Sequence, residues 1–163
     1  MKKRPKNTLA VRLSALLTMA LISTTASAQW VQKGQEIEGE NDMDQLGQID
    51  LSNDGNTMIV SSSVNDDGGN NAGKVRVFEW DGGTWVQKGS PIYGDAVDDQ
   101  FGWSVSVNTD GTIIAGGARS NDDAAHSGGH VRVFEWNGSD WSQLGVDIDG
   151  DIEYGAAGRC ALS

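Results

Sequence analysis

The sequence predicts an all-β protein made of tandem four-stranded antiparallel sheets, and three observations support this prediction. The string W-x-Q-x-G-x-x-I-x-G begins at Trp30, at Trp85 and again at Trp141. The string GKVRVFEW at 73–80 returns as GHVRVFEW at 129–136. Short alternating segments lie around these strings, and no segment after residue 28 has helical periodicity. Offsets of 55 or 56 residues between copies indicate a repeat architecture whose units stack on one another.

The second copy predicts the strands of one unit most clearly. Residues 101–107 alternate with a period of two, and residues 108–111 (NTDG) predict a tight turn. Residues 112–118 are mostly apolar or small, which predicts a second strand that is covered on both faces. A polar loop follows at 120–129. Residues 130–136 and 141–148 then predict the third and fourth strands, joined by a turn at 137–140.

Four short strands joined by hairpins resemble one blade of a β-propeller. The copies at 30–80 and 85–136, with a partial copy at 141–163, predict about two complete blades of a propeller-like array that forms an incomplete ring. Residues 157–163 fall at the phase of 101–107, so we expect the chain to be a fragment of a longer array. An incomplete array exposes a sheet edge, which could pair edge to edge with another copy.

Residues 1–28 read as a signal peptide. A basic start is followed by an apolar run at 13–22 and by the small residues Ala26-Ser27-Ala28, the order of parts in a cleaved export signal. The apolar run is too short for a membrane anchor, so we expect a secreted or cell-surface protein that starts at Gln29 and is not inserted in the membrane. Cys160 is the only cysteine, so no internal disulfide is expected.

The exported part, residues 29–163, is strongly acidic. It keeps seven basic and 23 acidic residues, a net charge of −16. This balance argues against nucleic acid or an anionic membrane as a partner, because both require a basic face. It favours solubility and attraction for cations.

The pair Phe101-Gly102, followed by Gly116-Gly117-Ala118, resembles the FG-GAP repeat of integrin α-chain propellers and of exported bacterial repeat proteins. The resemblance covers essentially residues 30–163 and implies a β-propeller. In that family the hairpin between the first two strands usually carries a calcium loop. Here the matching turns, 52–55 and 108–111, supply too few carboxylates, so family-style calcium binding is not expected there.

Acidic residues gather in other loops. The candidates for a calcium site are Asp95, Asp98, Asp99, Asp122 and Asp123, because clustered carboxylates can supply the oxygen ligands that calcium takes. The alternative is that Asp and Asn form turns by bonding their own backbone. Calcium is the one cofactor that the sequence suggests.

The tryptophans that flank the third turn of each copy predict cross-strand pairs, Trp80 with Trp85 and Trp136 with Trp141. Such pairs would hold the outer half of each sheet together, with Arg76 and Arg132 lying over Phe78 and Phe134 as cation–π partners. In the alternative interpretation, Trp85 and Trp141 form a surface platform for sugars.

No catalytic constellation is recognisable. Acidic pairs of the kind that glycosidases use arise by chance in so acidic a chain, and His126 and His130 lack further zinc ligands at suitable spacing. We therefore expect a secreted, non-enzymatic module that acts in adhesion or ligand binding, with an extracellular protein or glycan as partner. The alternatives are a structural spacer without a ligand and part of an extracellular hydrolase.

Overall fold

The computed structural model describes residues 29–42 and 44–163. The chain divides into two units, Met1–Val31 and Gln32–Ser163, and the fold described below is that of the second unit. The signal peptide expected at 1–28 lies outside the described residues. Every regular element of the described part is a β-strand, which confirms the predicted all-β class. None of the described segments forms an apolar helix long enough to cross a membrane.

The first sheet contains β1 (Leu46–Leu51), β2 (Thr57–Ser62), β3 (Lys74–Trp80), β4 (Trp85–Gln87) and β5 (Ile92–Tyr93). Its strand order is β1-β2-β3-β4, all antiparallel, with β5 also paired to β3. Because β4 and β5 lie along the same neighbour, they are two pieces of one interrupted fourth strand. The sheet is therefore a four-stranded meander, as predicted.

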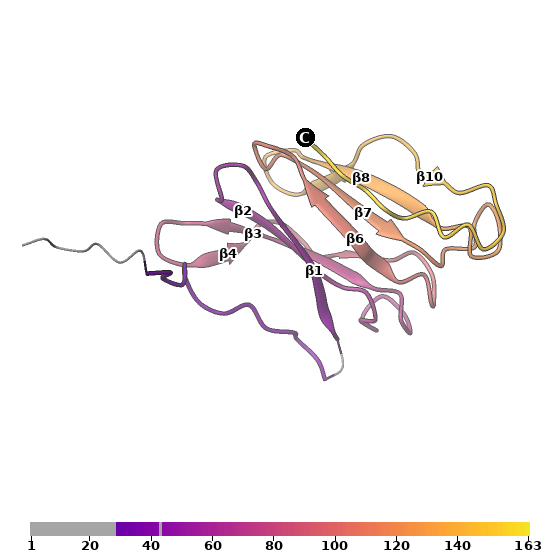
Figure 1. The fold of residues 1–163 in the computed structure, drawn as a ribbon, viewed down its shortest axis with the longest axis horizontal. Helices are drawn as coiled ribbons and strands as arrows, with labels where there is room; N and C mark the ends of the chain where they lie inside the picture. Colours follow the sequence, from indigo (N-terminus) through magenta and orange to yellow (C-terminus); the bar gives the residue numbers. More distant parts are fainter. Residues whose placement is uncertain (1–28, 43) are drawn as a thin grey trace, which may run out of the picture. The chain divides into compact units, whose positions relative to one another are not determined.

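The second sheet repeats this arrangement with β6 (Phe101–Val107), β7 (Ile113–Ala118), β8 (His130–Trp136), β9 (Trp141–Gln143) and β10 (Ile148–Asp149). Here β6, β7 and β8 pair in order, and both β9 and β10 pair with β8. Figure 1 shows the two sheets, the first in purple and magenta and the second in orange and yellow. They are tandem propeller-like blades that do not close into a ring.

The prediction of a continuous fourth strand over 141–148 is wrong. The strand is interrupted between β9 and β10, where Gly145 has a φ of +82°, and the equivalent Gly89 between β4 and β5 has a φ of +76°. A left-handed residue turns the chain out of the pleat, which breaks the ladder. Segments 30–39 and 157–163, which fall at the repeat phase of a fourth and of a first strand, form no strand either.

The main core lies between the two sheets. Side chains of β2 and β3 pack against those of β6, β7 and β8, with Ile59, Phe101 and Ile114 almost wholly buried. A second cluster, including Met58 and Phe78, covers the other face of the first sheet and contacts Ile37. Strand β2 is buried along its whole length because both of its faces are covered.

Equivalent positions of successive copies touch each other along the first strands. The Ser106 hydroxyl of β6 donates a 2.9 Å hydrogen bond to Asp50 of β1, which lies 56 residues earlier. The Leu162 backbone N–H donates to the Ser106 hydroxyl at the same offset, over 3.0 Å. Residues can meet their own counterparts only where neighbouring units converge, as the innermost strands of a propeller do. The C-terminal segment thus lies on the second sheet at the phase at which β6 lies on the first.

Gly73 makes this close approach possible. It has a φ of +89° and forms a parallel bridge with Phe101, and a Cβ at Gly73 would lie 2.2 Å from the Phe101 carbonyl oxygen. Its counterpart Gly129 faces Ala157 in the same way, with 1.8 Å between the hypothetical Cβ and the Ala157 carbonyl oxygen. The glycine that opens GKVRVFEW and GHVRVFEW is therefore required where the following copy begins.

Candidate functional site

The long connections, which follow β2, β5 and β7, all lie at one end of the strands, because successive strands of an antiparallel sheet run in opposite directions. We call this the loop end; it comprises the described residues of 40–45 and residues 63–73, 94–100 and 119–129. The short hairpins at 52–56, 81–84, 108–112 and 137–140 lie at the opposite end. All five predicted calcium candidates belong to the loop end. The site is therefore sought there.

Two buried asparagines organise the loop end. The Asn65 amide nitrogen donates a 2.8 Å hydrogen bond to Asp44, and its carbonyl oxygen accepts from the Asp67 backbone N–H. In the second copy Asn121 holds Asp99 and Asp123 in the same way, at 3.3 and 3.1 Å. Both asparagine side chains are fully buried. These loops are fixed in shape because their polar groups are satisfied internally.

The pKa of Asp44 reflects this arrangement. Burial acts to raise the pKa, but the hydrogen bonds from Asn65 and from the backbone N–H groups of Asn41 and Glu40 outweigh burial and lower it overall. Asp44 is thus held as a carboxylate. Its role is that of a bonded turn former, which is the alternative that the sequence left open for the acidic loops.

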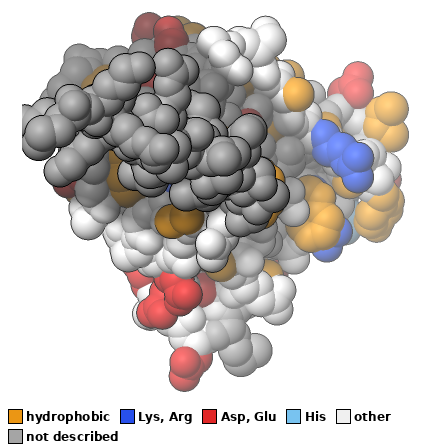
Figure 2. Space-filling model, turned by 60° about the vertical axis from the view of Figure 1, so that its left-hand side comes forward, with side chains coloured by type: hydrophobic (Ala, Val, Ile, Leu, Met, Phe, Trp, Pro, Cys, Tyr) orange, Lys and Arg blue, Asp and Glu red, His pale blue; other side chains and the backbone are white. Residues whose placement is uncertain are grey.

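A hollow of about 520 Å³ opens between the first two loops of the loop end. Carboxylates and amides dominate its wall, including Asp42, Asp66, Asn70 and Asn71. Acidic side chains also reach the surface at several places on the face shown in Figure 2. A concave, acidic, hydrogen-bonding wall suits a basic or hydroxyl-rich ligand.

The predicted calcium candidates do not form one constellation. Asp98 accepts a hydrogen bond from the Asn71 amide at 2.8 Å, and Asp122 accepts one from the Ser127 backbone N–H at 2.5 Å. Asp99 and Asp123 meet through Asn121, whereas Asp95 lies apart, beside Arg132. Calcium binding by these residues stays a prediction.

In the first copy, a buried ammonium occupies the base of the loop end. Lys74 of β3 is 4% exposed and hydrogen-bonds both Glu40 and Asp67, the latter over 2.7 Å. Burial acts to lower the pKa of Lys74, but the two carboxylates raise it overall. Arg76 reaches the same Glu40 across 3.2 Å. In this copy, the cation that balances the carboxylates is the Lys74 side chain itself.

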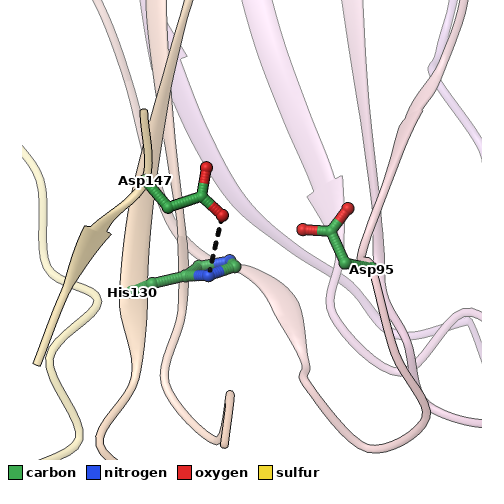
Figure 3. A group of neighbouring side chains, drawn as sticks. All are labelled: Asp95, His130 and Asp147. Carbon is green, nitrogen blue, oxygen red and sulfur yellow. Dashed lines mark ion pairs between the residues drawn. The ribbon is translucent and has the colours of Figure 1, made fainter. Parts of the chain in front are cut away.

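In the second copy, His130 of β8 takes the position of Lys74. His130 is fully buried, and neither ring nitrogen has a hydrogen-bond partner among the described residues. Asp147 lies 3.5 Å from Nδ1, and donor atoms of Asp95, His130 and Asp147 all lie within 4.8 Å of one another. Figure 3 shows the Asp147 carboxylate above the imidazole and the Asp95 carboxylate farther to its right. We call these three residues the His130 cluster.

Asp95 is shared between the His130 cluster and Arg132. The Arg132 guanidinium donates to Asp95 over 2.8 Å and to the Tyr93 carbonyl over 2.5 Å. Burial raises the pKa of Asp95; Arg132 and His130 oppose this rise, whereas Asp147 adds to it. The pKa rises overall because the negative charge of Asp95 is only partly compensated.

Sequence reasoning named Asp95 as a calcium candidate and set His130 aside for want of further zinc ligands, but it did not bring these two residues together with Asp147. Asp147 precedes a short strand and looks like one member of an acidic run, and His130 looks like the start of a strand. The cluster could have been found from the residues that differ between equivalent positions of the two copies. The buried Lys74 becomes His130, and Pro91 and Tyr93 become Asp147 and Asp149.

The predicted tryptophan pairs are present. Trp80 faces Trp85 and Trp136 faces Trp141 across their hairpins, each with ring centroids 5.3 Å apart in an edge-on arrangement. The predicted cation–π contacts are also present, with the Arg76 guanidinium 5.3 Å from the Phe78 ring and that of Arg132 5.6 Å from the Phe134 ring.

Each tryptophan pair is covered by a lysine of the preceding W-x-Q-x-G string. Lys33 lies 5.1 Å from the Trp85 ring, and its carbonyl accepts a 2.9 Å hydrogen bond from the Trp85 indole. Lys88 covers Trp141 in the same way, with a 2.8 Å bond from the indole to its carbonyl. Trp85 is 8% exposed, so a sugar stacking on it would have to displace Lys33. The sugar-platform role of Trp85 and Trp141 stays a prediction.

Trp103 is an aromatic residue that the sequence analysis did not single out. It is 39% exposed on β6, and the Arg119 guanidinium lies 3.6 Å from its ring centroid. In the first copy, Gly47 matches Gly102 and is followed by Gln48, so the repeat pattern alone gives no reason for an aromatic residue at position 103.

No protein-family model matches this sequence, and no curated protein matches it well enough to count as a relative.

Proposed function

We propose that this chain is an exported, non-enzymatic repeat module that binds an extracellular protein or glycan through its loop end. Membership of the FG-GAP-like repeat proteins is part of the proposal. The observation that carries it is the acidic hollow of about 520 Å³, which lies between loops held by buried Asn65 on a rigid sheet. Binding residues commonly lie on loops that a rigid scaffold positions.

The charge of the hollow defines the ligand. Asp42 and Asp66 line it without a lysine or arginine among the lining residues, so it favours cationic groups or arrays of hydroxyls. The Asp66 carboxylate is already engaged with the Asn71 backbone N–H at 2.8 Å. Asp42 and the Asn70 side chain make no hydrogen bond among the described residues, so both are available to a ligand.

The experiment is a binding screen of the full secreted chain against glycans and matrix proteins, at low and at physiological salt. In the double variant Asp42→Asn/Asn70→Ala, affinity for the identified ligand should fall at least about tenfold, which corresponds to about 1.4 kcal/mol. The matched control is Glu135→Gln, which removes one exposed carboxylate from β8 outside the hollow and should leave affinity unchanged.

Two outcomes would contradict the proposal. A screen without any ligand would favour a spacer role for the repeats. Equal loss of affinity in Glu135→Gln and in the double variant would show that net charge, and not the hollow, attracts the ligand. Thermal unfolding of both variants provides the check on folding, because none of the three side chains is buried.

A further inference from the structure

The two copies differ at one buried position in a way that changes its charge. In the first copy, the Lys74 ammonium lies between Glu40 and Asp67. In the second copy, the ammonium is replaced by the His130 imidazole, and its cross-strand neighbour changes from Tyr93 to Asp149. Asp147, in place of Pro91, adds another carboxylate 3.5 Å from the ring. The position loses a fixed cation and gains two carboxylates.

The buried imidazole has no partner that explains its burial. Both ring nitrogens of His130 lack hydrogen bonds among the described residues, although the side chain is 0% exposed. A buried polar group without a partner is costly, and in native proteins it usually marks a bound water or ion or a functional role. Here the carboxylates of Asp95 and Asp147 lie close to it (Figure 3).

We propose that Asp95, His130 and Asp147 bind a divalent cation of the zinc class, which takes the place that the Lys74 ammonium fills in the first copy. Zn²⁺ commonly takes one or more imidazole nitrogens with carboxylate oxygens, whereas Ca²⁺ and Mg²⁺ prefer oxygen ligands alone. This inference does not depend on the proposed ligand-binding function.

The geometry is close to what the ion requires. Zinc–ligand bonds of about 2.0–2.2 Å in a tetrahedron place the ligands about 3.3–3.6 Å apart, and the donor atoms of the His130 cluster already lie within 4.8 Å of one another. Closing the site needs only rotation of the two carboxylates. Their side chains are 46% and 28% exposed, which leaves an entry path and room for a water as fourth ligand.

Arg132 moderates the affinity without occupying the site. It contacts one oxygen of Asp95 at 2.8 Å, and the other oxygen is available to the ion. Because Asp95 belongs to the connection between β5 and β6 and His130 to β8, the cation would tie this connection to the second sheet. Its role is structural.

The test is thermal unfolding of the full secreted chain after EDTA treatment and dialysis, with and without Zn²⁺. At a concentration a hundredfold above the Kd, Zn²⁺ should raise the Tm by roughly 5–10 °C. Co²⁺, used as a spectroscopic substitute, should give visible absorption bands. His130→Lys, which restores the residue of the first copy, should fold without metal and lose both signals. Asp147→Asn should weaken Zn²⁺ binding at least tenfold.

The matched control is His126→Gln. His126 lies 3.3 Å from Asp122 in the same loop region but is exposed, so this variant should keep the full Zn²⁺ shift. The proposal is overturned if Zn²⁺ gives no shift, if His126→Gln abolishes it, or if His130→Lys retains it.

Discussion

Replacing Gly73 by alanine tests the contact through which one copy meets the next. At this position a Cβ would lie 2.2 Å from the Phe101 carbonyl oxygen and 2.5 Å from its nitrogen, and the φ of +89° is unfavourable for any residue with a side chain. Adopting the left-handed conformation costs alanine about 1–2 kcal/mol. Forcing the backbones apart adds about 1–3 kcal/mol, the usual range for overpacking. We expect Gly73→Ala to lower the free energy of unfolding by about 2–5 kcal/mol.

Gly55→Ala separates the two contributions. Gly55 lies in the β1–β2 hairpin with a φ of +66°, and a Cβ there would meet nothing within 4 Å. This variant should lose only the conformational share, about 1–2 kcal/mol. The assay is urea unfolding at equilibrium, followed by tryptophan fluorescence. If Gly73→Ala and Gly55→Ala are equally stable, the two sheets do not dock through Gly73, and the stacking described above is wrong.

Three further predictions concern stability and reactivity. Trp85→Ala should lower the free energy of unfolding, measured in urea, by about 3–5 kcal/mol, because Trp85 is buried beneath Lys33. A melting temperature equal to that of the parent would instead favour a binding role for this ring. The pKa values of Asp44 and Asp67 are lowered below 3.8, so the two ionised carboxylates stabilise the folded state above that pH. This stabilisation should be lost as the pH falls through their folded-state pKa values, which unfolding followed by circular dichroism will measure. An unchanged free energy of unfolding from pH 5 to 2 would contradict the lowered pKa values. Burial raises the pKa of the Cys160 thiol, and the hydrogen bond with Ser104 opposes this rise only weakly. A disulfide reagent should therefore react more slowly with the native protein than with the urea-unfolded chain. Equal rates would show that the C-terminal segment is not docked on the second sheet.

Much of the fold could be predicted because it depends on local patterns. The alternation at 101–107 and the turn at 108–111 appear in the structure as β6 and its hairpin, and the tryptophan pairs follow from the hairpin register. The broken fourth strand could not be predicted so easily. A glycine can adopt positive or negative φ, so Gly145 by itself does not reveal a break in the strand. The reason for a glycine becomes clear only at the equivalent Gly89, which lies against Trp141 and leaves no room for a side chain.

The candidate site was less predictable for a physical reason. Asp95, His130 and Asp147 come from three separate segments: Asp95 lies in the connection after β5, His130 in β8, and Asp147 just before β10. They meet only because the connection after β5 docks on the start of β8. No spacing rule within one copy can reveal such a group, whereas comparison of the two copies at position 74 and position 130 does.

The bonds between matching residues of successive copies, such as Asp50 with Ser106 and Ser106 with Leu162, also have a consequence for growth of the architecture. Each unit presents a side-chain oxygen, that of Asp50 or of Ser106, to a donor at the matching position of its successor, so further units can be appended at the same contact. Stability then accumulates through nearest-neighbour coupling, and unfolding should begin at the outermost unit and proceed inward.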